Sequence, residues 1–237
     1  MESKLKLDAF VLKVIAIIAM TCNHIAHGFM DYLPIYILAP IYVVGGLTFP
    51  IMAFLLSEGY RKTRNVKRYM LRLLVFGLIA LVPFAYAIKE IRFNVLITLL
   101  LGLICLYLND NMKNRVLFWL SFVGIVVFTV LCDWSIVGVP MIFMFGTIKD
   151  PKKKLLLPIL ATVLITALSL ILIIAEWDTQ EYLDLGFTAV ILGVIPLLSA
   201  YNGERGYSPP SLRYMFYIYY PAHLIVIWGI KLLMGIV

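Results

Sequence analysis

Three histidines are the side chains of this sequence best suited to chemistry, because each falls inside a long apolar stretch. His24 and His27 lie one helical turn apart near the start of the chain, and His223 lies near its end. An ionisable side chain within a membrane span is costly and usually serves a function or binds a partner. A neutral imidazole can accept a proton from a reacting group near neutral pH. We therefore predict a catalytic role for His24, leave catalysis and packing both open for His223, and assign His27 to packing near the outer interface.

The same three histidines also have the ligand type of a zinc site. His24 and His27 have i, i+3 spacing, and His223 could complete a triad. No Asp or Glu within the predicted apolar spans joins them, and the chain has no HExxH pattern. We therefore predict no metal site.

A block of basic residues follows the second apolar stretch, which ends at Ser57 and Glu58. If the helix continues, Glu58 can form an ion pair with Arg61 or Lys62, three or four residues further on. Charge alone favours a membrane anchor on the cytoplasmic side. Arginine and lysine also bind phosphate oxygens, so a phosphate site is the alternative interpretation. The block contains Arg61, Lys62, Arg64, Lys67, Arg68 and Arg72.

Two further polar features fall near the ends of predicted helices. Asp133 and Trp134 form a very short turn between two apolar stretches. This turn could place a carboxylate near His24 from the outer side, but the residues alone favour a solvated turn. Asn94 and Thr98 have i, i+4 spacing, which predicts a polar contact between helices.

These side chains must be positioned by membrane helices. Of the 237 residues, 63% are hydrophobic and 14% are charged, whereas a soluble domain is about half apolar and about a quarter charged. A soluble enzyme, a disordered region and a disulfide scaffold are excluded, because so much apolar surface requires lipid. We predict an all-α, polytopic integral-membrane helical bundle with about nine transmembrane helices, forming a single domain over residues 1–237. The predicted spans are 10–30, 35–57, 69–88, 93–108, 116–131, 136–147, 155–175, 185–200 and 212–235.

The basic residues predict the orientation of the chain. If the amino terminus is cytoplasmic and the spans alternate, 16 of the 20 Lys and Arg residues fall on the cytoplasmic side. We therefore predict a multi-pass protein of the plasma membrane with its amino terminus inside and its carboxyl terminus outside. The net charge of +7 then reflects topology, and we expect no nucleic-acid partner. An acidic segment falls on the outer side and comprises Glu176, Asp178, Glu181 and Asp184.

Several blocks of the sequence occur in an order that resembles the TraX family of multi-pass membrane proteins. The most specific block is EGYRKTRNVKRYMLRL at 58–73. Together the blocks cover about half of the chain, from the first apolar stretch to the last. The others include LDAFVLKVIAIIAMTCNHIAHGF, FNVLITLLLGL, DWSIVGV, YNGERG and YMFYIYYPAHLIVIW.

The resemblance implies an acetyltransferase, because the founding member of the family is linked to N-terminal acetylation of a conjugative pilin. By this likeness the catalytic candidates are the first-span His24, the outer-turn Asp133 and the last-span His223. The acetyl donor would be cytosolic acetyl-CoA as a co-substrate. The other partners would be membrane lipids and an unidentified envelope acceptor, either a peptide, a glycan or a lipid. The residues implied to hold CoA are Glu58, Arg61, Thr63, Arg64 and Arg68, with Arg61 and Arg64 as the main phosphate contacts.

Two positions depart from the family pattern. The usual D-H-I reads Asn23-His24-Ile25, and the usual G-R-x-x-F-P has Gly46 at its arginine position. An amide can hydrogen-bond a neighbour but cannot stabilise an imidazolium as a carboxylate does. Either Asp133 or Glu58 compensates, or the activity is weakened or redirected. The alternative function is a non-enzymatic membrane transporter or a degenerate scaffold of the same fold, although the chain has neither clear internal repeats nor paired broken helices.

Overall fold

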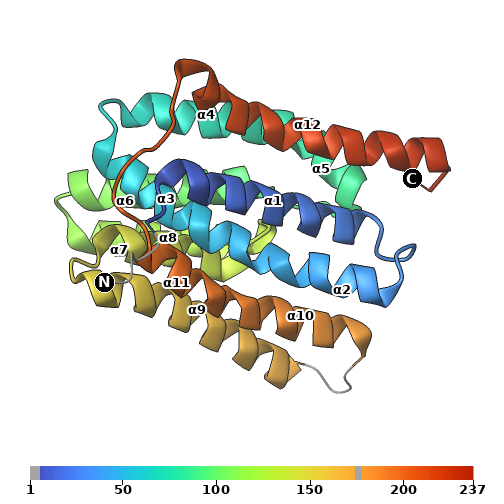
Figure 1. Ribbon diagram of the computed structural model, residues 1–237. Helices are drawn as coiled ribbons and strands as arrows, with labels where there is room; N and C mark the ends of the chain where they lie inside the picture. Colours follow the sequence, from blue (N-terminus) through green and yellow to red (C-terminus); the bar gives the residue numbers. More distant parts are fainter. Residues whose placement is uncertain (1–5, 174–177, 237) are drawn as a thin grey trace, which may run out of the picture. The chain divides into compact units, whose positions relative to one another are not determined.

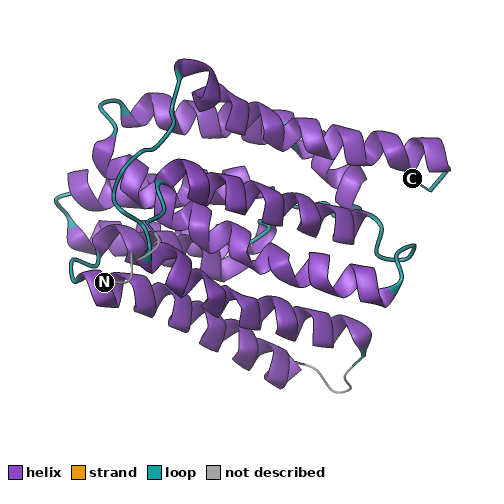
Figure 2. Cartoon of the chain, viewed as in Figure 1, coloured by secondary structure: helices purple, strands orange, loops and turns teal. Residues whose placement is uncertain are grey.

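The chain is helical in the computed structural model, which describes residues 6–173 and 178–236 (Figures 1 and 2). The predicted all-α class is therefore confirmed for the described residues. The Cα positions divide the chain into two compact units. Unit 1 comprises residues 1–52 and 150–212, and unit 2 comprises residues 53–149 and 213–237.

Unit 1 is built from helices taken from both ends of the chain. Its elements are α1 (Ala9–Gly28), α2 (Ile35–Val44), the 3₁₀ turn η1 (Gly45–Leu47), the first residues of α3 (Thr48–Lys62), α9 (Pro151–Ile173), α10 (Thr179–Val190), the 3₁₀ turn η3 (Ile191–Gly193) and α11 (Val194–Ser199). The helices α1, α2, α10 and α9 lie side by side in that order (Figure 1). Glycines allow α2 and α10 to approach closely, since a Cβ at Gly186 would lie 2.9 Å from the side chain of Val43.

The loop that contains the YNGERG block docks against the start of α1. The backbone N–H of Leu7 donates to the carbonyl of Ala200 at 2.8 Å. Asp8 caps α1, because its side chain accepts a hydrogen bond from the N–H of Val11 at 2.9 Å. Gly206 has a φ of +67°, and a Cβ at this position would overlap the Asp8 carboxylate. The last glycine of the block is thus required both for its backbone conformation and for space.

Unit 2 contains the remaining helices, which are mostly shorter. Its elements are the rest of α3, α4 (Val66–Ile79), α5 (Leu81–Ile88), α6 (Val95–Asn111), α7 (Arg115–Phe128), the 3₁₀ turn η2 (Thr129–Leu131), α8 (Ser135–Thr147) and most of α12 (Pro210–Met234). The central helix α6 packs against α4 and α8, and α7 also packs against α8. The helix α12 lies beside α4 and α5, where Phe76 stacks on Tyr217 and Tyr86 stacks on Trp228 (Figure 1).

Asn94 shows how a polar residue is accommodated in unit 2. It is fully buried, and its side chain caps α6 by accepting a hydrogen bond from the N–H of Leu96 at 3.1 Å. Its amide also donates to the carbonyl of Gly77 in α4 at 2.8 Å. The predicted polar contact between helices is therefore confirmed for Asn94.

The prediction of nine membrane spans is not confirmed. By length and composition, five helical stretches of the described chain can cross a membrane, and the pair α4 and α5, bent by 46°, can form a sixth. The other three predicted spans correspond to α6, α7 and α8, which have 17, 14 and 13 residues. Helices of this length extend about 20–25 Å, which is less than the roughly 30 Å of a hydrocarbon core. The five stretches are Ala9–Gly28, Ile35–Lys62, Pro151–Leu172, Thr179–Ser199 and Tyr214–Met234.

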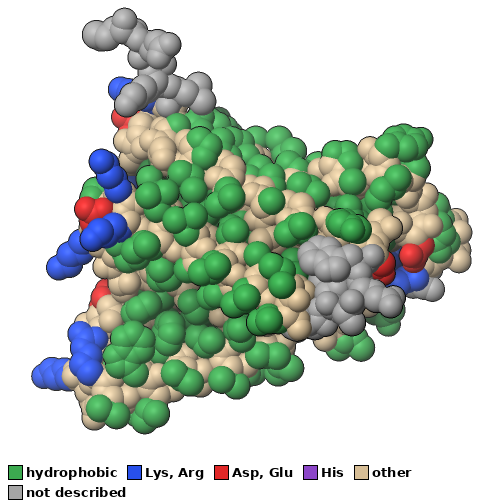
Figure 3. Space-filling model, turned by 90° about the horizontal axis from the view of Figure 1, so that it is seen from below, with side chains coloured by type: hydrophobic (Ala, Val, Ile, Leu, Met, Phe, Trp, Pro, Cys, Tyr) green, Lys and Arg blue, Asp and Glu red, His purple; other side chains and the backbone are tan. Residues whose placement is uncertain are grey.

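Large apolar side chains are exposed along several helices. On α9 the exposed fraction is 68% for Leu164 and 74% for Leu172, and on α12 it is 91% for Leu233. Hydrophobic side chains are also spread widely over the face seen in Figure 3. Exposed apolar surface of this extent indicates contact with lipid, so the helices indicate a membrane protein. The orientation of the two termini stays a prediction.

We expect Gly206→Ala to destabilise unit 1 by more than Gly203→Ala. Both glycines have positive φ, at +67° and +81°, so alanine costs about 1–2 kcal/mol at either position. Only the Cβ at 206 also overlaps Asp8, whose helix cap contributes about 1 kcal/mol. Thermal unfolding of the purified protein in detergent micelles measures the difference. Equal midpoints for the two variants would contradict the proposed docking of the loop on Asp8.

Candidate functional site

The residues predicted for function divide between the two units. His24 belongs to unit 1, and the other seven belong to unit 2. Within unit 2 they form one group at the end of α3 and start of α4, and a second group of Asp133 and His223. The first group is Glu58, Arg61, Thr63, Arg64 and Arg68.

The first group lies where α3 continues beyond its apolar part. Glu58 forms an ion pair with Lys62 at 3.8 Å, which confirms the predicted i, i+4 contact. The guanidinium of Arg61 donates from Nη2 to the carbonyl of Gly146 at 2.5 Å. This contact satisfies a carbonyl near the carboxyl terminus of α8, so Nη2 of Arg61 makes a structural contact within the protein.

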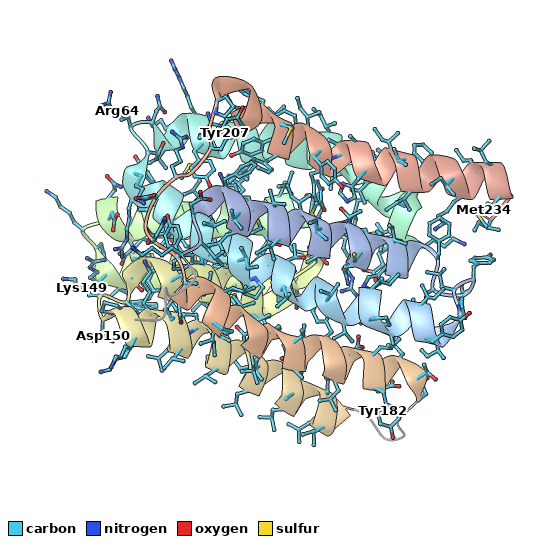
Figure 4. The ribbon with its side chains drawn as sticks, in the orientation of Figure 1. Arg64, Lys149, Asp150, Tyr182, Tyr207 and Met234 are labelled. Atoms are coloured by element: carbon cyan, nitrogen blue, oxygen red, sulfur yellow. The ribbon has the colours of Figure 1, made fainter. Side chains whose placement is uncertain are left out.

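The turn between α3 and α4 leaves other basic side chains exposed. The hydroxyl of Thr63 accepts a hydrogen bond from the N–H of Asn65 at 3.4 Å, and Asn65 caps α4 through the N–H of Arg68 at 2.9 Å. The side chains of Arg64 and Arg68 are exposed, and Arg64 extends away from the ribbon (Figure 4). These two guanidinium groups are therefore accessible to an anion in solution.

Arg72 has a more enclosed position than the rest of the basic block. Its guanidinium carbon lies 5.6 Å from the ring centre of Tyr69 and 5.8 Å from that of Tyr217. These distances are typical of cation–π contacts, which hold a guanidinium in place without neutralising it. The sequence placed Arg72 among the anchoring residues, and its aromatic partner on α12 is too distant along the chain to be read from spacing.

Asp133 lies in the turn between η2 and α8 and is half-buried. Its N–H donates to the carbonyl of Phe93 at 2.8 Å, which ties the turn to the segment before α6. Burial raises the pKa of Asp133 to about 7; the nearby Glu90 carboxylate adds to this rise, and Arg92 opposes it. Glu90 and Arg92 also form an ion pair with each other at 3.4 Å. A carboxyl group that titrates near neutral pH can both give and take a proton.

His223 is buried in α12 and makes a defined hydrogen bond. Its Nδ1 lies 2.8 Å from the carbonyl oxygen of Tyr219. Because a carbonyl only accepts, Nδ1 carries the hydrogen and Nε2 is the proton-accepting nitrogen of the neutral ring. The imidazole stacks on the Tyr219 ring and meets the edge of Tyr220, at centroid distances of 5.1 Å and 5.6 Å.

Tyr220 connects His223 with Asp133. Its side chain is 2% exposed, and its hydroxyl interacts electrostatically with the Asp133 carboxylate. Tyr220 thus interacts with both Asp133 and His223, which are 90 positions apart in the sequence. Tyr220 was not among the predicted site residues, because a tyrosine in an aromatic-rich span carries no local signal of such a contact.

His24 is buried in α1 of unit 1, with 6% of its surface exposed. The neighbouring Asn23 donates from its amide to the backbone carbonyl of Tyr42 at 3.4 Å. A Cβ at Gly45 would overlap Asn23, and a Cβ at Gly46 would overlap the carbonyl oxygen of Phe187 in α10. An arginine at position 46 therefore has no space while α10 is packed in this way.

Sequence reasoning missed a polar cluster in unit 1 that involves Tyr42, Gln180 and Asp184. The acidic segment was predicted to be an outer connection, with a span starting at 185. Instead α10 begins at Thr179, so Asp184 lies inside the candidate span Thr179–Ser199. The predicted span began one residue after Asp184, so this carboxylate was not counted among the polar residues within the spans. Glu176, the first acidic residue of that segment, lies outside the described residues.

A local signal for this helix start was present in the sequence. Asp178 accepts a hydrogen bond from the N–H of Gln180, and Glu181 accepts one from the N–H of Asp178. This reciprocal arrangement is a capping box, and D-x-x-E is its sequence signature. Reading DTQE as a capping box predicts a helix from Thr179 and places Gln180 and Asp184 on one face.

The family of this chain follows from its match to known proteins. The model of the TraX protein family matches residues 9–231. The chain belongs to the TraX family. It is similar to the probable fimbrial assembly protein FimC, serogroup H1, of Dichelobacter nodosus, with 30% identity over 257 residues. That alignment covers 98% of this chain and 99% of the relative. No solved structure matches the chain.

The TraX match extends from the beginning of α1 almost to the end of α12, so it includes all eight predicted residues. The resemblance inferred from the ordered blocks is therefore confirmed. In the described part of this TraX-family chain, His, Cys, Asp and Glu residues form no group of three or more that could hold a metal ion.

The raised pKa of Asp133 predicts a pH dependence of stability. Between its ordinary value of 3.8 and the folded value of about 7, the folded protein keeps the proton and the unfolded chain releases it. Stability therefore falls as pH rises through this range and is constant with respect to this group above it. We expect the unfolding midpoint of the wild type to fall more steeply between pH 4 and pH 7 than that of Asp133→Asn.

Thermal unfolding in detergent at a series of pH values measures this difference. Asp31→Asn is the matched control, because Asp31 is exposed and we expect it to retain the wild-type slope. An unchanged slope in Asp133→Asn would show that the folded Asp133 ionises at its ordinary pKa.

Proposed function

We propose that this protein is an integral-membrane acyltransferase that moves acetyl from cytosolic acetyl-CoA to an amine or hydroxyl acceptor at the outer face. The observation that carries the proposal is the match to the TraX family over residues 9–231, which contains every predicted site residue. The relative aligned over its full length is named a probable fimbrial assembly protein. A fimbrial subunit is therefore the first acceptor to test, ahead of envelope glycans and lipids.

The reaction requires a base and a group that protonates the leaving thiolate. The acceptor nitrogen or oxygen attacks the thioester carbonyl, a C–N or C–O bond forms, and the C–S bond breaks. We assign the base to His24, which takes the proton of the acceptor and returns it to the sulfur of CoA. A transient acetyl-imidazole on His24 is the covalent alternative. His24 is buried in α1, and a neutral imidazole can accept a proton in either role.

The donor nucleotide would bind to the basic block. Arg64 and Arg68 are exposed, and their guanidinium groups match phosphate oxygens in geometry and charge. Arg61 would contribute less than the sequence suggested, because its Nη2 is hydrogen-bonded to Gly146. With the amino terminus cytoplasmic, this block faces the compartment that holds acetyl-CoA.

Asp133 and His223 would form a second proton-handling pair. Nε2 of His223 is its accepting nitrogen, and Asp133 titrates near neutral pH. The Tyr220 ring contacts His223, and its hydroxyl interacts electrostatically with Asp133. We assign to this pair the exchange of protons with the outer side, because Asp133 lies in the turn that was predicted to face outward.

We expect His24→Ala to abolish transfer. Removing a general base lowers kcat by about 100-fold or more. The assay measures acetyl-CoA hydrolysis and acetylation of a purified fimbrial subunit by the protein in lipid nanodiscs. Cys22→Ala is the matched control, because it truncates another side chain of α1 and should retain the wild-type rate. Full activity in His24→Ala would remove His24 from the mechanism.

We also expect the double variant Arg64→Ala, Arg68→Ala to raise the KM for acetyl-CoA by roughly tenfold with little change in kcat. The reason is that contacts to the nucleotide phosphates are equally strong in the ground state and in the transition state. The control is Lys152→Ala, Lys153→Ala, which removes the same charge from exposed positions of α9. Equal KM values for the two double variants would contradict the nucleotide site. Absence of both turnover and CoA binding in the wild type would instead favour the non-enzymatic scaffold.

A further inference from the structure

Three side chains of unit 1 form a closed hydrogen-bonded cluster between α2 and α10. The hydroxyl of Tyr42 donates to Oδ1 of Asp184. The amide of Gln180 donates to the Tyr42 hydroxyl at 3.0 Å and to the same Asp184 oxygen at 3.1 Å. Each member thus contacts the other two. Tyr42 and Asp184 are 142 positions apart in the sequence, so the cluster is a property of the fold.

The same tyrosine also contacts α1 on both sides of His24. The ring of His27 lies 4.9 Å from the Tyr42 ring, with the planes inclined by 44°. The backbone carbonyl of Tyr42 accepts the amide of Asn23 at 3.4 Å. Residues 23 and 27 of α1 are therefore both held by one residue of α2, and His24 lies between them in the chain.

The surroundings of Tyr42 make its hydroxyl bonds difficult to replace. The residue is 4% exposed and packs in an apolar cluster with Ala26, Leu38 and Leu183. The Phe187 ring meets the Tyr42 ring edge-on at 5.8 Å. A buried hydroxyl that loses its partner cannot be compensated by water, so Asp184 and Gln180 fix the rotamer of Tyr42.

We propose that Tyr42 is a positioning residue for the acyl transfer, held by Asp184 and Gln180 so that it fixes His27 and Asn23 on the polar face of α1. The proposal rests on the proposed function for its catalytic consequence, but not for the contacts themselves. Under this proposal, the carboxylate that compensates for the missing aspartate at position 23 belongs to Asp184 of α10, and not to Asp133 or Glu58. It also explains Asn23, because an aspartate there would bring a carboxylate against the Tyr42 carbonyl oxygen and could not donate to it.

Two conservative variants test the proposal. Tyr42→Phe removes only the hydroxyl and keeps the ring contact with His27 and the carbonyl that binds Asn23. Asp184→Asn keeps the shape of the carboxylate but removes its charge. The matched controls are Tyr36→Phe and Asp31→Asn, since Tyr36 is 76% exposed and Asp31 is also exposed.

The first measurement is the separation of kcat from KM for the full-length protein in nanodiscs. We expect Tyr42→Phe to lower kcat about tenfold, because it removes the hydrogen bond from the Tyr42 hydroxyl to Asp184. Asp184→Asn keeps an acceptor oxygen but weakens this bond, so kcat should fall by a smaller factor. The KM for acetyl-CoA should stay within about twofold, because nucleotide binding is assigned to other residues. Both controls should match the wild type.

The second measurement does not depend on turnover. Diethyl pyrocarbonate modifies neutral imidazoles, and mass spectrometry of the peptide around His27 gives its rate of modification. We expect this rate to change severalfold in Tyr42→Phe and Asp184→Asn and to stay at the wild-type value in the controls. If the wild type is inactive but the two variants alter His27 reactivity, the acyltransferase proposal fails, while the positioning of His27 by Tyr42 is supported. Wild-type kcat and His27 reactivity in both variants would overturn the positioning role itself.

Discussion

Hydrocarbon offers no hydrogen bonds, so every polar group inside a membrane helix must find its partner within the protein. Lys231 illustrates how far this constraint extends. Its side chain is 1% exposed, and its ammonium donates to the carbonyl of Ala87 at 2.9 Å, with Tyr86 at 3.4 Å. These carbonyls belong to the last turn of α5, where helical partners are missing and a positive charge is favourable. A lysine that would be costly alone thereby joins α12 to α5, in addition to the stacking of Tyr86 on Trp228.

The same constraint explains which parts of the fold could be predicted. Hydropathy located each apolar segment, because the need to face lipid acts on every residue of a span. It also predicted spans at α6, α7 and α8, because hydropathy reports apolar character and not helix length. These helices have 17, 14 and 13 residues, which is short for a full span. Local caps mark helix ends in the sequence, but two of them were not used. Asn94 was predicted as a contact between helices although it also caps α6, and the DTQE box at Asp178 was missed, so the start of α10 was placed six residues late.

In the candidate site, too, contacts between residues close in the sequence could be predicted, whereas contacts between distant segments could not. The Glu58–Lys62 ion pair follows from i, i+4 spacing, and its prediction was confirmed. The environments of His223 and Asp133 depend on Tyr220, and Asp184 depends on Tyr42. These contacts cross 87 and 142 positions of sequence, counted from Asp133 to Tyr220 and from Tyr42 to Asp184. Nothing in the periodicity of a span specifies which distant helix supplies its polar partner. The ordered blocks identified the family, but not these partners.

The two departures from the family pattern can be understood as one structural change. Gly46 leaves space for the carbonyl of Phe187, and Gly186 leaves space for Val43, so α10 packs closely against η1 and α2. This close packing brings Asp184 to the hydroxyl of Tyr42. An arginine at position 46 would displace α10 and break that contact. At position 23 the amide of Asn23 donates to the Tyr42 carbonyl, which an aspartate could not do. Gly46 in place of arginine and Asn23 in place of aspartate are therefore both compatible with the same close packing of α10 against η1 and α2.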